Sequence, residues 1–284
     1  MPRLLIAGCG YLGQAVGDLF AAVNWEVEGW TLSAESANQL RFSSGRSVDI
    51  SNLDQVRAAA GDFDAVVHAA STRGGAPDSY RRVYLKGLGN LLECFSNSKT
   101  VFVSSTSVYA QAAGEWVTEE SAADPTTETG KILREAEDLA VAKNAIVLRL
   151  GGIFGPGRSA LLKKFLSGDA TIDPANDRFM NEIHRDDAAT AIQLLLTSGE
   201  SGGQVYNVVD NEPILLSEGY RWLAARLNRP LPPVGRSTSK RKRGDSNKRV
   251  SNAKLKASGW TPRYPNFAAG MEESVLPSFA GEIT

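Results

Sequence analysis

The chain has 284 residues, of which 42% are hydrophobic and 22% are charged, a composition typical of a folded globular protein and not of a disordered one. Its formal net charge of −1 argues against bulk electrostatic binding to nucleic acid. No apolar run approaches the roughly 18–20 residues that cross a membrane. The N-terminus also lacks the charged region, apolar region and cleavage site of a signal peptide. We therefore expect a cytoplasmic protein with no nucleic-acid partner and no membrane contact.

Cysteine and histidine are too scarce to suggest disulfide or metal chemistry. Cys9 lies within a glycine-rich loop, and with Cys94 as the second cysteine the pair makes an unlikely disulfide, so we expect reduced thiols. With two histidines and no CxxC or HExxH pattern, we expect no metal site.

The first half of the chain alternates short apolar runs with amphipathic stretches. The expected strands are residues 4–7, 26–31, 65–68, 101–104 and 146–150, with a sixth at 205–208. The expected helices are residues 14–23, 54–60, 80–95 and 131–142. Four of the first five strands are almost continuously apolar, which is typical of parallel strands buried on both faces. The pattern predicts an α/β fold of the Rossmann type, with a doubly wound parallel sheet.

A glycine motif, Gly8-x-Gly10-x-x-Gly13, joins the first expected strand to the first expected helix. Gly8 would allow the tight turn, Gly10 would let the backbone approach a pyrophosphate, and Gly13 would let the helix pack closely on the strand. The helix N-terminus would direct its free N–H groups at the phosphates. In this context the motif predicts dinucleotide binding.

The second half of the chain is more mixed. Gly155-Pro156-Gly157 interrupts the alternation, and a final helix is expected at residues 267–275. We expect residues 1–155 to form the nucleotide-binding domain, with residues at about 180–210 returning to it. Residues 156–284 would mainly form a smaller substrate lobe. Residues 236–249 carry seven basic side chains against one aspartate, and we leave open whether this segment is a solvated loop or a clamp for a phosphate or carboxylate substrate.

Several motifs in order resemble those of the extended or atypical short-chain dehydrogenases/reductases, the NAD-dependent epimerase/dehydratase family. They are GCGYLG (8–13), VDI (48–50), VHAA (67–70), SSTSVY (104–109), LRLGGIFGPGR (148–158), NEIHRDDA (181–188) and the C-terminal KRVSN (248–252) with GW (259–260) and YP (264–265). The resemblance covers nearly the whole chain, and its C-terminal part is similar to an atypical bacterial subgroup.

The resemblance implies roles for matching positions. The pyrophosphate would lie on Gly8, Gly10, Tyr11, Leu12 and Gly13; the adenine on Asp49 and Ile50; the ribose and nicotinamide along Ala69, Ala70, Ser104, Gly152 and Ile153. Ser105 would hydrogen-bond the reacting oxygen, and Arg158 and Arg249 would contact substrate.

The chain departs from the family at its catalytic Tyr-x-x-x-Lys pair. A lysine four residues after a tyrosine on one helix face would lower the pKa of the phenol. The matching positions hold Thr129 and Leu133, and none of the seven tyrosines has a lysine four residues on. An aliphatic hydroxyl is a poor acid near neutral pH without a neighbouring base. Thr129 could still relay a proton, and Tyr109 is either a stand-in for the missing phenol or, as we favour, a packing or gating residue.

Cofactor choice follows from the residues after the second strand. An acidic residue there would bind the ribose 2′-hydroxyl of NAD, but this chain has Thr31, Leu32 and Ser33. Thr31, Ser33, Arg41 and Arg46 could instead contact a 2′-phosphate, so we slightly prefer NADP over NAD.

Two functions remain open from the sequence. One is an oxidoreductase or epimerase-like enzyme with a degenerate active site, acting on a small polar substrate for which nucleotide-linked compounds are candidates. The other is a non-catalytic NAD(P)-binding redox sensor, favoured by the missing Tyr–Lys pair.

Overall fold

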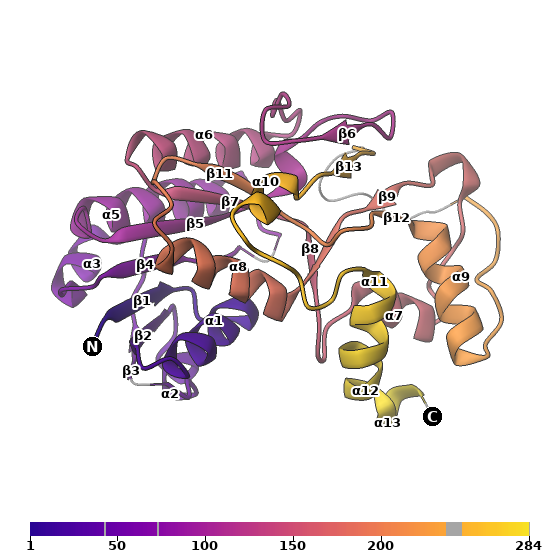
Figure 1. The fold of residues 1–284 in the computed structure, drawn as a ribbon, viewed down its shortest axis with the longest axis horizontal. Coiled ribbons are helices and arrows are strands. Elements are labelled where there is room, and N and C mark those ends of the chain that lie inside the picture. The colour runs from indigo at the N-terminus through magenta and orange to yellow at the C-terminus, as the bar shows by residue number, and fades with distance from the viewer. Residues whose placement is uncertain (43, 73, 237–245, 284) are drawn as a thin grey trace.

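A seven-stranded parallel sheet forms the centre of the molecule (Figure 1). The computed structural model describes residues 1–42, 44–72, 74–236 and 246–283. The strands of this sheet are β1 (Arg3–Ala7), β2 (Glu26–Thr31), β3 (Ser44–Ser47), β4 (Ala65–His68), β5 (Lys99–Ser105), β7 (Ile146–Leu150) and β11 (Val205–Val208). Their order is β11-β7-β5-β4-β1-β2-β3, and all neighbouring pairs are parallel. The predicted Rossmann-type α/β fold is confirmed.

All six strands predicted from apolar runs are present, but β3 was missed. Its sequence, Ser-Gly-Arg-Ser, contains no large apolar side chain, and all four residues are exposed. Because β3 is the outermost strand beside β2, it needs no buried face, and hydrophobic periodicity gives no signal for it.

Helices cover both faces of the sheet because alternate strand side chains point to opposite sides. On one face, Leu4 and Ile6 pack with α1 (Tyr11–Ala21) and α8 (Arg185–Thr197). On the other face, Leu5 and Phe102 pack with side chains of α3 (Leu53–Ala59), α5 (Gly87–Cys94) and α6 (Glu128–Ala142). Figure 1 shows these two helical layers on either side of the strands.

Two predicted helices contain π-helical segments. The helix expected at residues 80–95 consists of α4 (Pro77–Tyr80), a π-helical segment (Arg81–Lys86) and α5. The helix expected at residues 267–275 is α11 (Phe267–Gly270) followed by a second π-helical segment (Met271–Val275). It continues into α12 (Leu276–Ser278) and is followed by α13 (Ala280–Ile283).

Short strand pairs connect the sheet to the rest of the chain. The three pairs are β8 (Gly152–Phe154) with β10 (Glu182–His184), β9 (Phe179–Met180) with β12 (Ile214–Leu215), and β6 (Trp116–Val117) with β13 (Arg249–Val250). The remaining helices are α2 (Ala34–Asn38), α7 (Ala160–Leu166), α9 (Leu216–Leu227) and α10 (Ala253–Ala257), and 3-10 turns lie at Thr106–Val108 and Pro174–Asn176.

A second apolar core lies beyond the sheet. It brings together Leu162 of α7, Leu223 of α9, Phe267 of α11 and Met271. In Figure 1 these helices form the part of the molecule on the right, away from the sheet. None of the helices in the described ranges combines the length and apolarity needed to cross a bilayer.

Candidate active site

The glycine loop has the geometry that its motif predicts. Gly8 has φ +101°, and a Cβ there would overlap the backbone of Ala70. A Cβ at Gly13 would overlap the carbonyl oxygen of Gly8, which explains the close packing of α1 on the loop. A Cβ at Gly10 would meet no atom within 4 Å. The loop therefore leaves an open approach at Gly10, beside a helix N-terminus with N–H groups that lack intrahelical acceptors.

Tyr11, the first residue of α1, connects this loop to the segment after β8. Its hydroxyl donates a hydrogen bond to the carbonyl oxygen of Pro156 at 3.0 Å. The guanidinium carbon of Arg158 lies 5.1 Å from the ring centroid, and that of Arg185 lies 4.9 Å from it. Burial raises the pKa of Tyr11, and the two arginines act in the opposite direction. Two cations therefore lie beside the glycine loop: Arg158, which was predicted as a substrate contact, and Arg185, which was not predicted.

Polar side chains after β2 are committed to local contacts. The Thr31 hydroxyl donates to the carbonyl of Ser33 at 2.8 Å, and Ser33 caps α2 by accepting from the N–H of Ser36. Leu32 is 70% exposed. The buried carboxylate of Glu28 accepts from the indole of Trp30 and pairs with Arg46 at 3.1 Å. This end of β2 thus presents no free carboxylate within residues 26–33.

Asp49, Ile50 and Ala69–Ala70 lie along the neighbouring strand ends. The Asp49 carboxylate accepts from the N–H and hydroxyl of Ser51, and Ile50 is buried against Gly87. The N–H of Ala69 donates to the carbonyl of Ala7, at the end of β1. These residues reach the same carboxyl edge of the sheet as the glycine loop.

Ser104 and Ser105 at the end of β5 have different surroundings. The Ser104 hydroxyl is buried and donates to Glu137 Oε1 at 2.6 Å, so it is not directed at a ligand. Ser105 is half-buried, and its Oγ accepts from the N–H of Ser107. Because only Ser105 keeps partial exposure, we retain it and not Ser104 as a site residue.

Tyr109 belongs to a buried polar network, with no exposed surface. Its hydroxyl donates to the carbonyl of Thr118 or the side-chain oxygen of Asn207, both 2.9 Å away, and accepts from Arg149 at 2.8 Å. Burial raises its pKa. The complete burial of this phenol favours the packing interpretation, and we assign it no catalytic role.

The centre of that network is an ion pair that the sequence analysis missed. Arg149 of β7 binds Glu137 of α6 at 2.7 Å, and both side chains are almost completely buried. Two signals in the sequence could have revealed this pair. Arg149 is a charged residue within the apolar strand 146–150, and Glu137 lies on the apolar face of the helix 131–142.

The two positions that the sequence analysis matches to the Tyr–Lys pair lie early in α6. Thr129 is half-buried in the first turn, two residues after the capping Thr127. Leu133 is 3% exposed and packs in the apolar core. The helix therefore presents a hydroxyl at position 129 and a core alkyl side chain at position 133.

Arg249 is held by aromatic neighbours instead of being free. Its guanidinium lies 5.3 Å from the Trp116 ring and 5.0 Å from the Phe179 ring, and its Nε donates to the carbonyl of Gly114. Burial and Arg178 lower the pKa of Lys248 to about 8. The basic residues Lys240 to Arg243 of the same segment lie outside the described residues.

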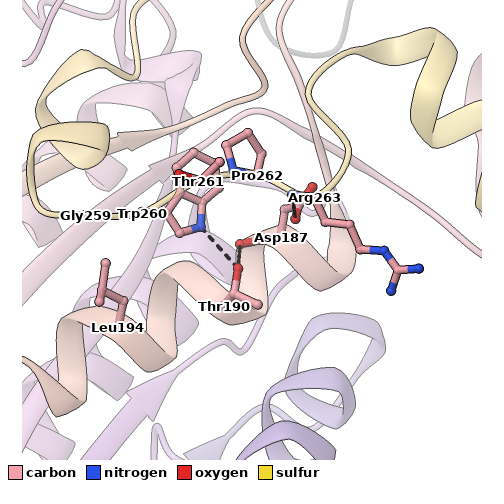
Figure 2. A pocket seen from close by; sticks show the side chains of 8 residues that line it. All are labelled: Asp187, Thr190, Leu194, Gly259, Trp260, Thr261, Pro262 and Arg263. Carbon is pink, nitrogen blue, oxygen red and sulfur yellow. Dashed lines mark hydrogen bonds between the residues drawn. The ribbon is translucent and has the colours of Figure 1, made fainter.

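A shallow pocket of about 380 Å³ lies between α8 and residues 259–263 (Figure 2). The indole of Trp260 donates to the hydroxyl of Thr190 at 3.1 Å, and the N–H of Arg263 donates to Asp187 at 2.7 Å. The polar groups that line the pocket thus hold this segment against α8.

Among the described residues, no cluster of three or more His, Cys, Asp or Glu side chains has a metal-binding arrangement.

Comparisons with known proteins agree with the fold and the loop. The sequence profile of the NAD dependent epimerase/dehydratase family matches residues 4–208. The protein YeeZ of Escherichia coli K12 is 29% identical over 221 residues, covering 73% of this chain and 77% of its own.

Two solved structures extend the comparison over the whole chain. A Methylobacillus flagellatus protein, provisionally described as an NAD-dependent epimerase/dehydratase, is 30% identical with a TM-score of 0.77, covering 95% of this chain and 96% of its own. The UDP-glucose 4-epimerase of Thermus thermophilus, solved with NAD, is 21% identical with a TM-score of 0.79, covering 98% of this chain and 99% of its own. The second likeness is one of fold.

Proposed function

Because this chain belongs to the NAD-dependent epimerase/dehydratase family, we propose that it binds a nicotinamide dinucleotide along the carboxyl edge of the sheet. We further propose that it acts as an oxidoreductase or epimerase-like enzyme on a small polar, nucleotide-linked substrate. The UDP-glucose 4-epimerase solved with NAD has the same fold, which supports both the cofactor and the substrate class.

The open glycine loop carries the proposal. The backbone at Gly10 has free space in front of it, the N-terminus of α1 lies beside it, and Ala70 closes the loop from behind. Gly8, Gly10, Tyr11, Leu12 and Gly13 would hold the pyrophosphate, with Arg158 and Arg185 supplying positive charge. Asp49 and Ile50 would line the adenine, and Ala69, Ala70, Gly152 and Ile153 the nicotinamide half.

The bound dinucleotide would supply hydride chemistry, and the protein would position the reacting oxygen. Ser105 would donate a hydrogen bond to that oxygen from the end of β5. Thr129 offers a second hydroxyl from α6, although without a neighbouring lysine it cannot provide an acidic proton. Arg158 would contact substrate from the segment that follows β8, and Arg249 from β13 itself.

We assign NADP as the preferred cofactor. The only carboxylate on β2 near this end, Glu28, is buried and neutralised by Arg46, so it would not repel a 2′-phosphate. To donate to that phosphate, Ser33 would exchange its contact with Ser36, and Arg46 its contact with Glu28.

A non-catalytic redox sensor is the second candidate. The observation that favours it is the placement of Leu133 in the core, where an enzyme of this family would present an ammonium. Robust turnover that disappears on substitution of Ser105 would exclude it.

Calorimetric titration with NADP⁺ and NAD⁺ tests the proposal. Wild-type protein should bind NADP⁺ with micromolar affinity. In Gly10→Asp the new carboxylate would enter the open space and repel the phosphates, so binding should weaken at least 100-fold. Gly10→Asn, of similar size and without charge, is the matched control and should lose less affinity. Absence of binding to either dinucleotide at millimolar concentration would reject the proposal.

A further inference from the structure

Glu182 lies where the sheet passes into the second core. It opens β10 and stands opposite Gly152 of β8 in the parallel pair. A Cβ at Gly152 would lie 3.7 Å from Glu182 Cγ and 3.8 Å from its Oε1. The carboxyl group therefore borders the space that the missing side chain of residue 152 leaves open.

One oxygen of this carboxyl has no partner. Glu182 Oε2 is fully enclosed and accepts no hydrogen bond from any described residue. A carboxylate in such surroundings has lost its hydration without compensation. Burial accordingly raises the pKa of Glu182 to about 7, well above that of an exposed glutamate.

A second residue with a buried carboxyl, Asp210, is joined to Glu182 through the backbone. The N–H of Asp210 donates to the carbonyl oxygen of Glu182 at 2.7 Å, and Asp210 is 3% exposed. Burial raises the pKa of Asp210 well above its usual range, and the charge of Glu182 raises it further. Glu212 and Asp187 are the other charged groups that act on Asp210, and both act in the same direction. The main influences on the two carboxyls are burial and other acidic groups, so double ionisation is disfavoured.

We propose that Glu182 and Asp210 form a carboxyl pair that stores a proton at the nicotinamide end of the site. The pair would release this proton when the oxidised, positively charged ring is bound and retain it beside the neutral reduced ring. This inference rests on the proposed function, because the ring must lie next to Gly152.

The same pair could supply the proton that a catalytic phenol would otherwise provide. A bound reduced dinucleotide would supply hydride to a carbonyl substrate, whose oxygen would then need a proton. Glu182 would then lose its carboxyl proton as a new O–H bond forms on the substrate oxygen. The resulting carboxylate would face the positive oxidised ring, which stabilises it, and the proton would be regained from solvent after exchange of the cofactor.

The test counts protons and needs no substrate. Titrations of NADP⁺ and NADPH at pH 7 are carried out in two buffers of different ionisation enthalpy, phosphate and Tris. Because the free protein holds this proton on the carboxyl, binding of NADP⁺ should release a measurable fraction of a proton, and binding of NADPH less. Glu182→Gln should abolish the difference between the two ligands. Glu120→Gln, at an exposed position before α6 that acts on neither carboxyl, is the matched control and should retain it.

The outcomes separate the carboxyl pair from the proposed function. Equal proton release with NADP⁺ and NADPH in the wild-type protein would overturn the carboxyl pair while leaving the proposed function intact. The carboxyl pair would also be overturned if Glu182→Gln showed the same difference in proton release between NADP⁺ and NADPH as the wild-type protein. Failure of either dinucleotide to bind would reject the proposed function and the pair together. Should Glu182→Gln not fold, Asp210→Asn is the second variant, and it should shift the pH at which proton release is greatest to lower values.

Discussion

The hydroxyl of Tyr11 donates a hydrogen bond to the carbonyl oxygen of Pro156 at 3.0 Å, although 145 residues separate them in the chain. Tyr11 belongs to the glycine loop, and Pro156 follows β8, where the chain leaves the sheet for the second core. The contact therefore ties the proposed cofactor loop to the segment that carries Arg158.

Removal of the Tyr11 hydroxyl should weaken the contact between the glycine loop and the segment after β8 without changing the loop itself. In Tyr11→Phe we expect the free energy of unfolding to fall by about 0.5–1.5 kcal/mol, the usual net value of one such hydrogen bond. Urea denaturation at neutral pH measures the change. Tyr80→Phe is a suitable control, since the Tyr80 hydroxyl has no hydrogen bond to the described part of the chain. An equal loss in both variants would mean that the Pro156 contact contributes nothing.

The buried ion pair predicts a much larger effect. Glu137→Gln would leave the charge of Arg149 uncompensated in the protein interior. Removal of one partner of a buried ion pair lowers the free energy of unfolding by about 3–5 kcal/mol. Glu135→Gln is the matched control on the same helix, because Glu135 is exposed and its ion pair with Arg81 is 3.7 Å long. The control should change stability by less than about 1 kcal/mol. Similar chemical denaturation curves for the two variants would refute a structural role for the pair.

The sheet could be predicted because its strands are buried on both faces and therefore continuously apolar. The glycine loop could be predicted because its residues are contiguous. Edge strand β3 could not, since its exposed sequence obeys no hydrophobic pattern. Helices α8 and α9 were also missed. The regular alternation of apolar runs that located the earlier helices is absent from this half of the chain.

Sites formed by residues from separate elements were beyond the sequence. Ser104, Glu137 and Arg149 come from β5, α6 and β7, and only the packing of α6 on these strands brings them together. Glu182 gains its position because β10 returns beside β8. Nothing in the linear sequence places this carboxyl opposite Gly152 or beside Asp210.

The end of β2 offers a direct test of cofactor choice. In Thr31→Asp a carboxylate would face the ribose 2′ position, where it accepts from a hydroxyl and repels a phosphate. We expect the ratio of NADP⁺ to NAD⁺ affinity to fall by about tenfold or more, measured by calorimetry. Thr31→Asn, which is uncharged, should change the ratio far less. An unchanged ratio in Thr31→Asp would show that the adenosine ribose lies elsewhere.

His184 predicts how stability depends on pH. The ring has no exposed surface, its Nδ1 accepts from the N–H of Asp186, and its Nε2 therefore donates to Ser274 Oγ at 2.9 Å. Burial lowers the pKa of His184 to about 4, and Arg185 and Arg263 add to this effect against the opposing charge of Asp186. The imidazole is thus neutral in the folded protein, and its 3.8 Å approach to Asp186 is not an ion pair at neutral pH.

Because the folded pKa lies below the unfolded value near 6.5, the unfolded chain takes up a proton first as the pH falls. Stability from this group is complete above about pH 6.5 and is lost progressively down to about pH 4. Between pH 7 and pH 5 its share of the loss should be about 1–2 kcal/mol. Urea denaturation at both pH values should show a smaller loss in His184→Asn, whose amide can still cap α8. Ser274→Ala keeps the titrating ring and should lower stability at both pH values while preserving most of the pH dependence. If His184→Asn and the wild-type protein lose stability equally over this range, another group is responsible for the acid sensitivity.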